Sequence, residues 1–325
     1  MSGVQFSIVV ACYNQEAFVR QAVESALGQQ FPNKEVIVVD DCSRDRTADV
    51  LRTFGDSIHL AVLPKNVGAV AARNHGAALA TGEYLVFLDG DDVLMPWALE
   101  VYSRLIAARH PRFLFGRCVL FRGELPKRTP DDAPSEVQFV EYSHFFAKDR
   151  PCVFNTSTFV IERSAFWSVA GWSPEIFYQD IQDLVTKLGV SGNIILLLGP
   201  DTVWYRMHST NAVTKVLPFV DGIYVLLGKA RAGAYPGGNE CWLERSAWFG
   251  GLIFYWMKTS LRAGHYGPGF RLLVTGWWMI LLAIVRRGRA WLTGRKPAET
   301  ISLEHDHAPE VLQGTYQTAR KIERT

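Results

Sequence analysis

The sequence predicts an α/β protein built on a doubly wound, mostly parallel sheet. Short apolar runs alternate with amphipathic stretches through the first hundred residues, and conspicuous polar residues come directly after the apolar runs. The composition, 48% hydrophobic and 20% charged over 325 residues, is that of an ordinary globular chain. Strands and helices that alternate in this rhythm are typical of parallel sheets with helices on both faces.

The first strand is expected at residues 6–11, because FSIVVA is nearly continuous in apolar, β-rich side chains. Residues 16–29 carry apolar side chains at helical spacing, and Phe31-Pro32-Asn33 ends that helix. By the same criteria, strands are expected at 35–39, 58–63 and 83–88, and helices at 46–54 and 69–80.

Polar side chains follow three of these strands where each strand ends. Tyr13 follows the first strand, Asp40 and Asp41 follow the second, and Asp89 and Asp91 follow the fourth. In such sheets ligands bind beyond the carboxyl ends of the strands, so these side chains indicate one site. Crowded carboxylates call for a compensating cation, and Asp-x-Asp supplies oxygen ligands suited to Mg²⁺ or Mn²⁺.

Several classes of protein are disfavoured. No GxGxxG follows the first strand and no GxxxxGK[ST] occurs, so a glycine-rich phosphate loop is not expected. The net charge of +2 gives no sign of nucleic-acid binding, and none is expected. Five scattered cysteines without a CxxC pair argue against a disulfide framework or zinc site, and the N-terminus has no basic signal region. We therefore expect a cytoplasmic location.

The second half of the chain changes in character. Strands at 113–121 and 156–161, with a polar loop at 125–135 between them, are expected to complete a first domain at 1–217. Residues 218–296 are expected to be helical and aromatic-rich, with a helix at 241–262 and a break at Gly267-Pro268-Gly269. Residues 297–325 are expected to be a polar, loosely ordered tail with some helical character.

The helical region carries a signal for membrane contact. From 262 to 298 there are seven Arg or Lys and no Asp or Glu, and six of the ten tryptophans lie between 242 and 291. The uncharged stretch at 272–285 is shorter than the roughly 20 residues that span a bilayer. A helix lying at an anionic membrane surface is favoured, and a buried helix of a soluble bundle and a true span remain alternatives.

Five stretches resemble the family 2 glycosyltransferases, inverting enzymes with the GT-A fold. They are VVACYNQEAFVRQAVESALGQQF, EVIVVDDCSRDRTADVL, NVGAVAARNHGAALATGEYLVFLDGDD, GWSPEIFYQDIQD and WYRMHSTNAVT, covering roughly residues 5 to 215. The resemblance implies a nucleotide-diphosphate-sugar donor, with UDP as the default, and Mn²⁺ or Mg²⁺. It implies transfer to a saccharide or lipid-linked acceptor in bacterial cell-surface polysaccharide or glycolipid synthesis, at the inner face of the membrane. The QxxRW pattern of processive synthases is missing, so a single sugar is expected per encounter.

The resemblance also implies roles for individual residues. Nucleotide contacts are expected from Ala11, Tyr13, Asp40, Asp41, Arg73 and Asp89. Asp91 and His208 are expected on the metal, and Arg206 near the diphosphate. Asp180 is expected to be the general base, with Asp183 as an alternative base or acceptor contact. The family's usual Glu-Asp pair reads Gln179-Asp180 here.

Other interpretations stay open at this point. Arg73 on an alanine-rich helix is commonly a surface charge, and a lone histidine such as His208 is commonly structural. A haloacid-dehalogenase-type phosphatase would use Asp89 and Asp91, although the Thr or Val usual after the second Asp is missing. A non-catalytic nucleotide-sugar binding protein is a further alternative, which the presence of Asp91 and Asp180 disfavours.

Overall fold

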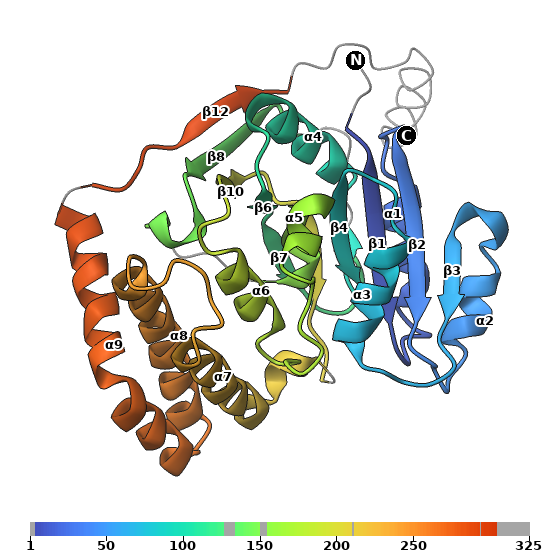
Figure 1. Cartoon of the computed structure of the whole chain (residues 1–325). Coiled ribbons are helices and arrows are strands. Elements are labelled where there is room, and N and C mark those ends of the chain that lie inside the picture. Colours follow the sequence, from blue (N-terminus) through green and yellow to red (C-terminus); the bar gives the residue numbers. More distant parts are fainter. Residues whose placement is uncertain (1–3, 127–133, 150–154, 210, 293, 304–325) are drawn as a thin grey trace, which may run out of the picture.

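The computed structural model describes residues 4–126, 134–149, 155–209, 211–292 and 294–303. A mixed sheet with helices on both faces forms its centre (Figure 1). In the described part of the chain this sheet has nine strands, in the order β12-β8-β10-β6-β9-β4-β1-β2-β3. Their bounds are β1 Phe6–Cys12, β2 Lys34–Asp40, β3 His59–Val62, β4 Tyr84–Asp89, β6 Phe113–Phe115, β8 Glu136–Tyr142, β9 Phe159–Glu162, β10 Ile194–Gly199 and β12 Glu299–Ser302. The α/β class is confirmed.

Parallel pairing is concentrated in the N-terminal half of the sheet. β3, β2, β1 and β4 are parallel neighbours, as the alternation of strands and helices predicts. β9 runs antiparallel between β4 and β6, and β8 runs antiparallel to both β10 and β12. The sheet is therefore mixed, and its parallel half carries the carboxyl-end rim where the polar residues were expected.

The helices cover the sheet in two layers. One layer consists of α1 Val19–Leu27, α2 Thr47–Arg52 and α4 Ala98–Arg109, and the other of α3 Ala69–Leu79, α5 Arg163–Ser168 and α6 Asp180–Leu188. Ile8 and Val10 of β1 join the core of the first layer, and Val9 and Ala11 join that of the second. Because β1 is covered on both faces, its sequence is a continuous apolar run rather than an alternation.

A second, small sheet pairs β5 Val93–Leu94, β11 Val203–Arg206 and β7 Cys118–Phe121. The single strand expected at 113–121 is therefore divided between two sheets at Gly116. A Cβ there would lie 2.5 Å from Thr202 Oγ1, so the chain changes sheet where only glycine fits. The strand expected at 156–161 begins later, because Thr156–Thr158 form a 3-10 turn.

Three helices, α7 Val216–Arg231, α8 Trp242–Arg262 and α9 Tyr266–Leu292, follow the sheet (Figure 1). The break between α8 and α9 lies at 263–265 and not at Gly267-Pro268-Gly269. Those three residues form the first turn of α9, where a proline without an N–H is tolerated. α8 and α9 pack closely, since a Cβ on Gly250 would lie 1.8 Å from the Met279 carbonyl oxygen.

The expected polar tail is partly structured. β12 pairs antiparallel with β8 at one edge of the large sheet, and the following Leu303 is buried in the core. The prediction of a loosely ordered tail from 297 is thus wrong for 299–303, because Ile301 and Leu303 add apolar surface to that core. Residues 304–325, and 127–133 of the loop expected at 125–135, lie outside the described residues.

Candidate active site

The carboxyl ends of β1, β2 and β4 form one rim, because these strands are parallel neighbours. Ala11 of β1 pairs with Val39 of β2 and with Asp89 of β4, so the residues after each strand start from one level. The Ala11 carbonyl also accepts the Gly90 N–H at 3.1 Å. Tyr13 follows β1 and is 39% exposed on this rim. The expected site residues after the three strands are therefore brought together.

Asp40 and Asp41 are buried at the end of β2 and hold the neighbouring loops. Asp40 accepts hydrogen bonds from the hydroxyl and the N–H of Ser43. Asp41 accepts the N–H groups of Val67 and Gly68, at 2.7 and 2.8 Å, in the turn that starts α3. Both carboxylates thus stabilise the loops that surround the rim. Their contact with a nucleotide stays a prediction.

Arg73 of α3 joins two of the expected site residues. Its Nη1 donates to Asp180 Oδ2 at 2.7 Å, and its Nη2 donates to Asp89 Oδ1 at 2.6 Å. The side chain is buried, with its guanidinium 5.7 Å from the centre of the Trp172 ring. The interpretation of Arg73 as a surface charge is therefore wrong.

The position and charge of Arg73 have clear physical causes. α3 lies close against β1, since a Cβ on Gly76 would be 2.4 Å from Val9 Cγ1. Burial lowers the pKa of Arg73, but Asp89 and Asp180 raise it by more, so the guanidinium stays charged. Its Nε is buried and has no hydrogen-bond partner within the described residues.

Asp91 and His208 meet on the rim although they lie far apart in the sequence. His208 Nε2 is 2.8 Å from Asp91 Oδ2, and the imidazole stacks on Phe18 with ring centroids 5.0 Å apart. β11, in the small sheet, carries the chain towards His208. Gly90 makes the turn possible, since a Cβ there would lie 2.2 Å from Gln15 Oε1. Burial and then Asp89 raise the pKa of Asp91, and His208 opposes the rise.

Asp92 is a site residue that the sequence analysis did not assign. It is fully buried, and it accepts the Ser157 hydroxyl at 2.6 Å and the Arg206 N–H at 3.0 Å. Burial, then Asp91 and Asp89, raise its pKa well above the ordinary value. Asp92 therefore connects the turn at residues 89–92, here called the acidic turn, to the end of β11. Its position as the third carboxylate of LDGDD was the sequence signal that could have identified Asp92 as part of the site.

Arg206 has a different environment from the one expected. Its Nε donates to the Asp91 carbonyl at 2.9 Å, and its Nη atoms donate to the Gly123 carbonyl and the Gln21 side chain. The guanidinium also lies 4.9 Å from the centre of the Phe18 ring and 4.6 Å from the centre of the Phe121 ring. With these partners Arg206 positions the acidic turn, and its expected contact with a diphosphate stays a prediction.

Asp180 is the first residue of α6 and lies at the edge of the rim. Its Oδ1 accepts the Ile181 N–H at 2.8 Å, while Oδ2 accepts from Arg73. Burial raises the pKa of this carboxyl and Arg73 lowers it, with a net rise. The neighbouring Gln179 is buried and donates to the Phe219 carbonyl of α7 at 3.0 Å. The glutamine in place of the family's glutamate thus contacts a helix of the C-terminal region.

Asp183, the alternative base, is fully buried. Its oxygen atoms accept from the Ser173 hydroxyl at 2.6 Å, the Tyr235 hydroxyl at 2.7 Å and Lys229 at 2.8 Å, and Lys187 lies 3.7 Å away. This geometry contradicts a role for Asp183 as base or acceptor contact. The spacing of three residues from Asp180 suggested a similar face, but Asp183 points towards α7.

The expected metal ligands pass a simple test of fit. Asp91 Oδ2 and His208 Nε2 are 2.8 Å apart, close to the roughly 3 Å between adjacent ligands of an octahedral ion with bonds of about 2.1 Å. Carboxylate oxygen and imidazole nitrogen both suit Mn²⁺. No group of three or more His, Cys, Asp or Glu with metal-binding geometry occurs within the described residues. A metal held here would need further ligands from a diphosphate or water.

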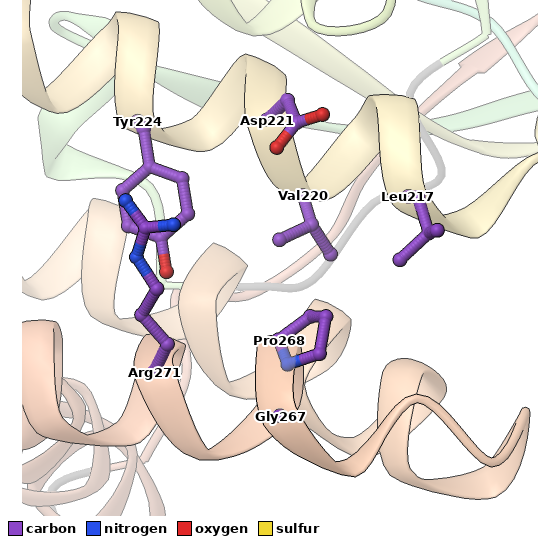
Figure 2. Close-up of a pocket in the computed structure, with 7 residues that line it drawn as sticks. All are labelled: Leu217, Val220, Asp221, Tyr224, Gly267, Pro268 and Arg271. Atoms are coloured by element: carbon purple, nitrogen blue, oxygen red, sulfur yellow. The ribbon is translucent and has the colours of Figure 1, made fainter.

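A separate cavity of about 380 Å³ lies between α7 and α9 (Figure 2). It is lined by Leu217, Val220, Asp221, Tyr224, Gly267, Pro268 and Arg271. None of the residues expected at the active site lines it.

The family model described as Glycosyl transferase family 2 matches residues 7–169, half of the chain. The putative teichuronic acid biosynthesis glycosyltransferase TuaG of Bacillus subtilis is 37% identical over 112 residues, 34% of this chain and 44% of that relative. The Escherichia coli protein named UDP-Glc:alpha-D-GlcNAc-diphosphoundecaprenol beta-1,3-glucosyltransferase WfaP is 41% identical over 88 residues, 26% of this chain and 35% of that relative. The chain thus matches less than half the length of both relatives.

Among solved structures, the crystal structure of S. aureus TarS 1-349 in complex with UDP-GlcNAc matches with a TM-score of 0.54. The match covers 82% of this chain and 90% of that chain, at 16% sequence identity. At this identity the similarity shows a shared fold.

Proposed function

Because the chain belongs to glycosyl transferase family 2, we propose that it transfers a single sugar from a nucleotide-diphosphate-sugar donor to an acceptor hydroxyl, with inversion. One observation carries the proposal. The buried Arg73 links Asp89, on the rim where the nucleotide would lie, to Asp180, the candidate base. Arg73 thereby holds the rim and the candidate base next to each other.

Asp180 is proposed as the general base. It would accept the proton of the acceptor hydroxyl as the acceptor oxygen bonds to the anomeric carbon. The bond from that carbon to the donor phosphate breaks, and its electron pair leaves with the nucleoside diphosphate. Burial raises the pKa of this carboxyl, which makes it a better base than an exposed one, and Arg73 opposes that rise and so favours the ionised form.

The nucleotide is proposed to lie along the rim, with Tyr13 against the base and Asp40, Asp41 and Asp89 below it. UDP is the default donor nucleotide. Both the TuaG and the WfaP names concern UDP-sugar or surface-polymer chemistry of bacteria. By this similarity the acceptor is proposed to be a saccharide or lipid-linked saccharide of cell-surface synthesis, reached from the cytoplasmic side of the membrane.

Asp91 and His208 would hold a divalent metal, Mn²⁺ or Mg²⁺. When bound, such an ion neutralises the charge that develops on the departing diphosphate. Burial, and then the crowding of the neighbouring carboxylates, raise the pKa of Asp91 and Asp92. Arg206 and Asp92 keep the Asp91 turn in place for this role.

Thermal unfolding with UDP, dTDP, GDP and CMP, each with and without Mn²⁺, tests the donor site. A ligand at a hundred times its Kd stabilises by about 2.7 kcal/mol. For a chain of this size the midpoint should then rise by roughly 5 °C. We expect a metal-dependent rise with one nucleoside diphosphate, lost in Asp91→Ala. The absence of a rise with every nucleotide would contradict the proposed donor class.

A further inference from the structure

One face of α9 is apolar, and within the described residues it is uncovered along its length. Eight apolar side chains, spaced three or four residues apart and therefore on one side of the helix, are 38–70% exposed: Tyr266, Phe270, Leu273, Val274, Trp277, Leu281, Ile284 and Val285. The opposite side, which includes Leu272 and Gly276, packs on α8. Soluble monomers rarely expose so long an apolar strip, so this face, here called the α9 face, indicates a binding surface.

The charged residues of α9 itself are all basic. Arg271, Arg287 and Arg289 are exposed on the same helix, and no Asp or Glu occurs between 262 and 298. Arg271, which lines the cavity, extends from α9 to lie 4.6 Å from the centre of the Tyr224 ring of α7 (Figure 2). An apolar strip fringed by Arg and carrying a tryptophan fits the boundary between the headgroups and acyl chains of an anionic bilayer.

By length and composition α9 could also cross a membrane, since its most apolar 18-residue window within Tyr266–Ala290 has a mean hydropathy of 1.6, and 28% of that window is buried. Its connections oppose a span. Arg286 donates to the carbonyls of Phe146 and Lys148, and β12 pairs with β8 soon after the helix ends. Because a span places its two ends on opposite sides of about 30 Å of hydrocarbon, it would break either these attachments or those at the beginning of the helix.

The beginning of α9 is equally fixed to the rest of the molecule. Pro268 and Arg271 line the cavity opposite Val220 and Tyr224 of α7. The other side of α7 contacts Gln179, next to the candidate base, through the Phe219 carbonyl. Both ends of α9 are therefore attached to the body of the protein. Its exposed face can contact a membrane only if the helix axis lies parallel to the membrane plane.

We propose that the α9 face docks the protein on the surface of an anionic phospholipid membrane, with α9 parallel to the membrane plane. A second copy of the chain is a poorer occupant, because a symmetric contact would bring two sets of Arg271, Arg287 and Arg289 together. The docking does not depend on the transferase reaction. It would keep the protein at the surface that carries lipid-linked acceptors, and that consequence alone rests on the proposed function.

Co-sedimentation of the full chain with phosphatidylcholine vesicles, with and without about a third phosphatidylglycerol, tests the proposal. We expect binding to the anionic vesicles and at least about tenfold weaker binding to the neutral ones, since each Arg near the surface contributes about fivefold. Leu281→Glu should reduce vesicle binding about tenfold or more, because it places a charge in the apolar strip. The matched control is Leu79→Glu, which adds the same charge at a leucine of α3 that is 44% exposed, and it should bind like the unmodified protein.

Folding of each variant is checked by its thermal midpoint, and Arg271→Glu/Arg287→Glu gives a second variant outside the apolar strip. That double variant should lose the preference for anionic vesicles. Equal binding by Leu281→Glu, or equal binding to neutral vesicles, would overturn the proposal. The proposal would also be overturned if the unmodified protein bound no vesicles and formed a dimer in sedimentation equilibrium that Leu281→Glu dissociates. Resistance to alkaline carbonate extraction from cell membranes would show a span and would likewise overturn it. Since vesicle binding needs no turnover, failure here is separate from failure of the donor test.

Discussion

Two carboxylates three residues apart on α6 have opposite environments. Asp180 lies at the edge of the rim with Arg73 as its cationic partner among the described residues, and Arg73 is shared with Asp89. Asp183 is fully buried, with Lys229 and Lys187 beside it and hydroxyls from Ser173 and Tyr235. The environment of Asp180 leaves its carboxylate able to act on a substrate. The carboxylate of Asp183 is instead fully occupied by contacts with other side chains of the protein.

The same contrast separates the rim from the cluster around Asp183 as a whole. At the rim, burial and mutual repulsion raise the pKa of Asp91, Asp92 and Asp180, so ionising these groups costs free energy. Around Asp183, two lysines and two hydroxyl groups stabilise the buried negative charge. These contacts also join α6 to α7 and to Tyr235. Asp91 and Asp180, whose ionisation the protein compensates only in part, are the carboxylates proposed to receive a metal or a substrate, whereas the fully paired Asp183 holds helices together.

The largest expected effect is on catalysis, from Asp180→Asn. Loss of a general base typically lowers the rate by about 10² to 10⁴-fold. Folding and nucleotide-dependent stabilisation should be kept, because Asn fits the same space and Asp89 still holds Arg73. The check is sugar transfer by coupled nucleotide release, alongside the thermal midpoint with UDP and Mn²⁺. Full activity in this variant would remove Asp180 from the mechanism and favour a different base.

Asp183→Asn should show the reverse pattern. It leaves Lys229 and Lys187 without a buried counter-charge, and breaking a buried pair of this kind costs about 3 kcal/mol. The free energy of unfolding, measured in urea, should fall by that order. Activity per folded molecule should stay close to that of the unmodified protein. A variant with unchanged stability and abolished transfer would reverse the assignments of the two carboxylates.

A smaller effect is expected from Arg73→Gln, which acts on pH dependence. Arg73 lowers the pKa of Asp180 against the effect of burial, so its removal should raise that pKa further. The base would then be protonated over a wider acidic range, and the acid limb of kcat against pH should move to higher pH by about 1 to 3 units. Arg73→Lys keeps the charge and serves as the control, with a limb near the original position. An unmoved limb in Arg73→Gln would show that the link to Asp180 does not control its ionisation.

Much of the parallel half of the fold could be predicted from the sequence. The apolar runs of β1, β2 and β4 are strong signals because both faces of each strand are covered. The polar residues after them, from Tyr13 to Asp91, necessarily gather at one rim once those strands are parallel neighbours. The family match to residues 7–169 covers this same half. Expectations for the second half were weaker, since β6 and β7 are short and belong to different sheets.

Local pattern determined which carboxylates follow strands, because strand and turn signals depend on residues close together in the chain. Only the tertiary structure decided their partners. The small sheet brings His208 to Asp91, α3 brings Arg73 between Asp89 and Asp180, and the packing of α7 on α6 encloses Asp183. Similarly, the composition of α9 indicated an apolar helix, but the attachments of its two ends decided which face remains exposed. Compensation of charge and burial depend on contacts between distant segments, and these contacts exist only in the folded chain.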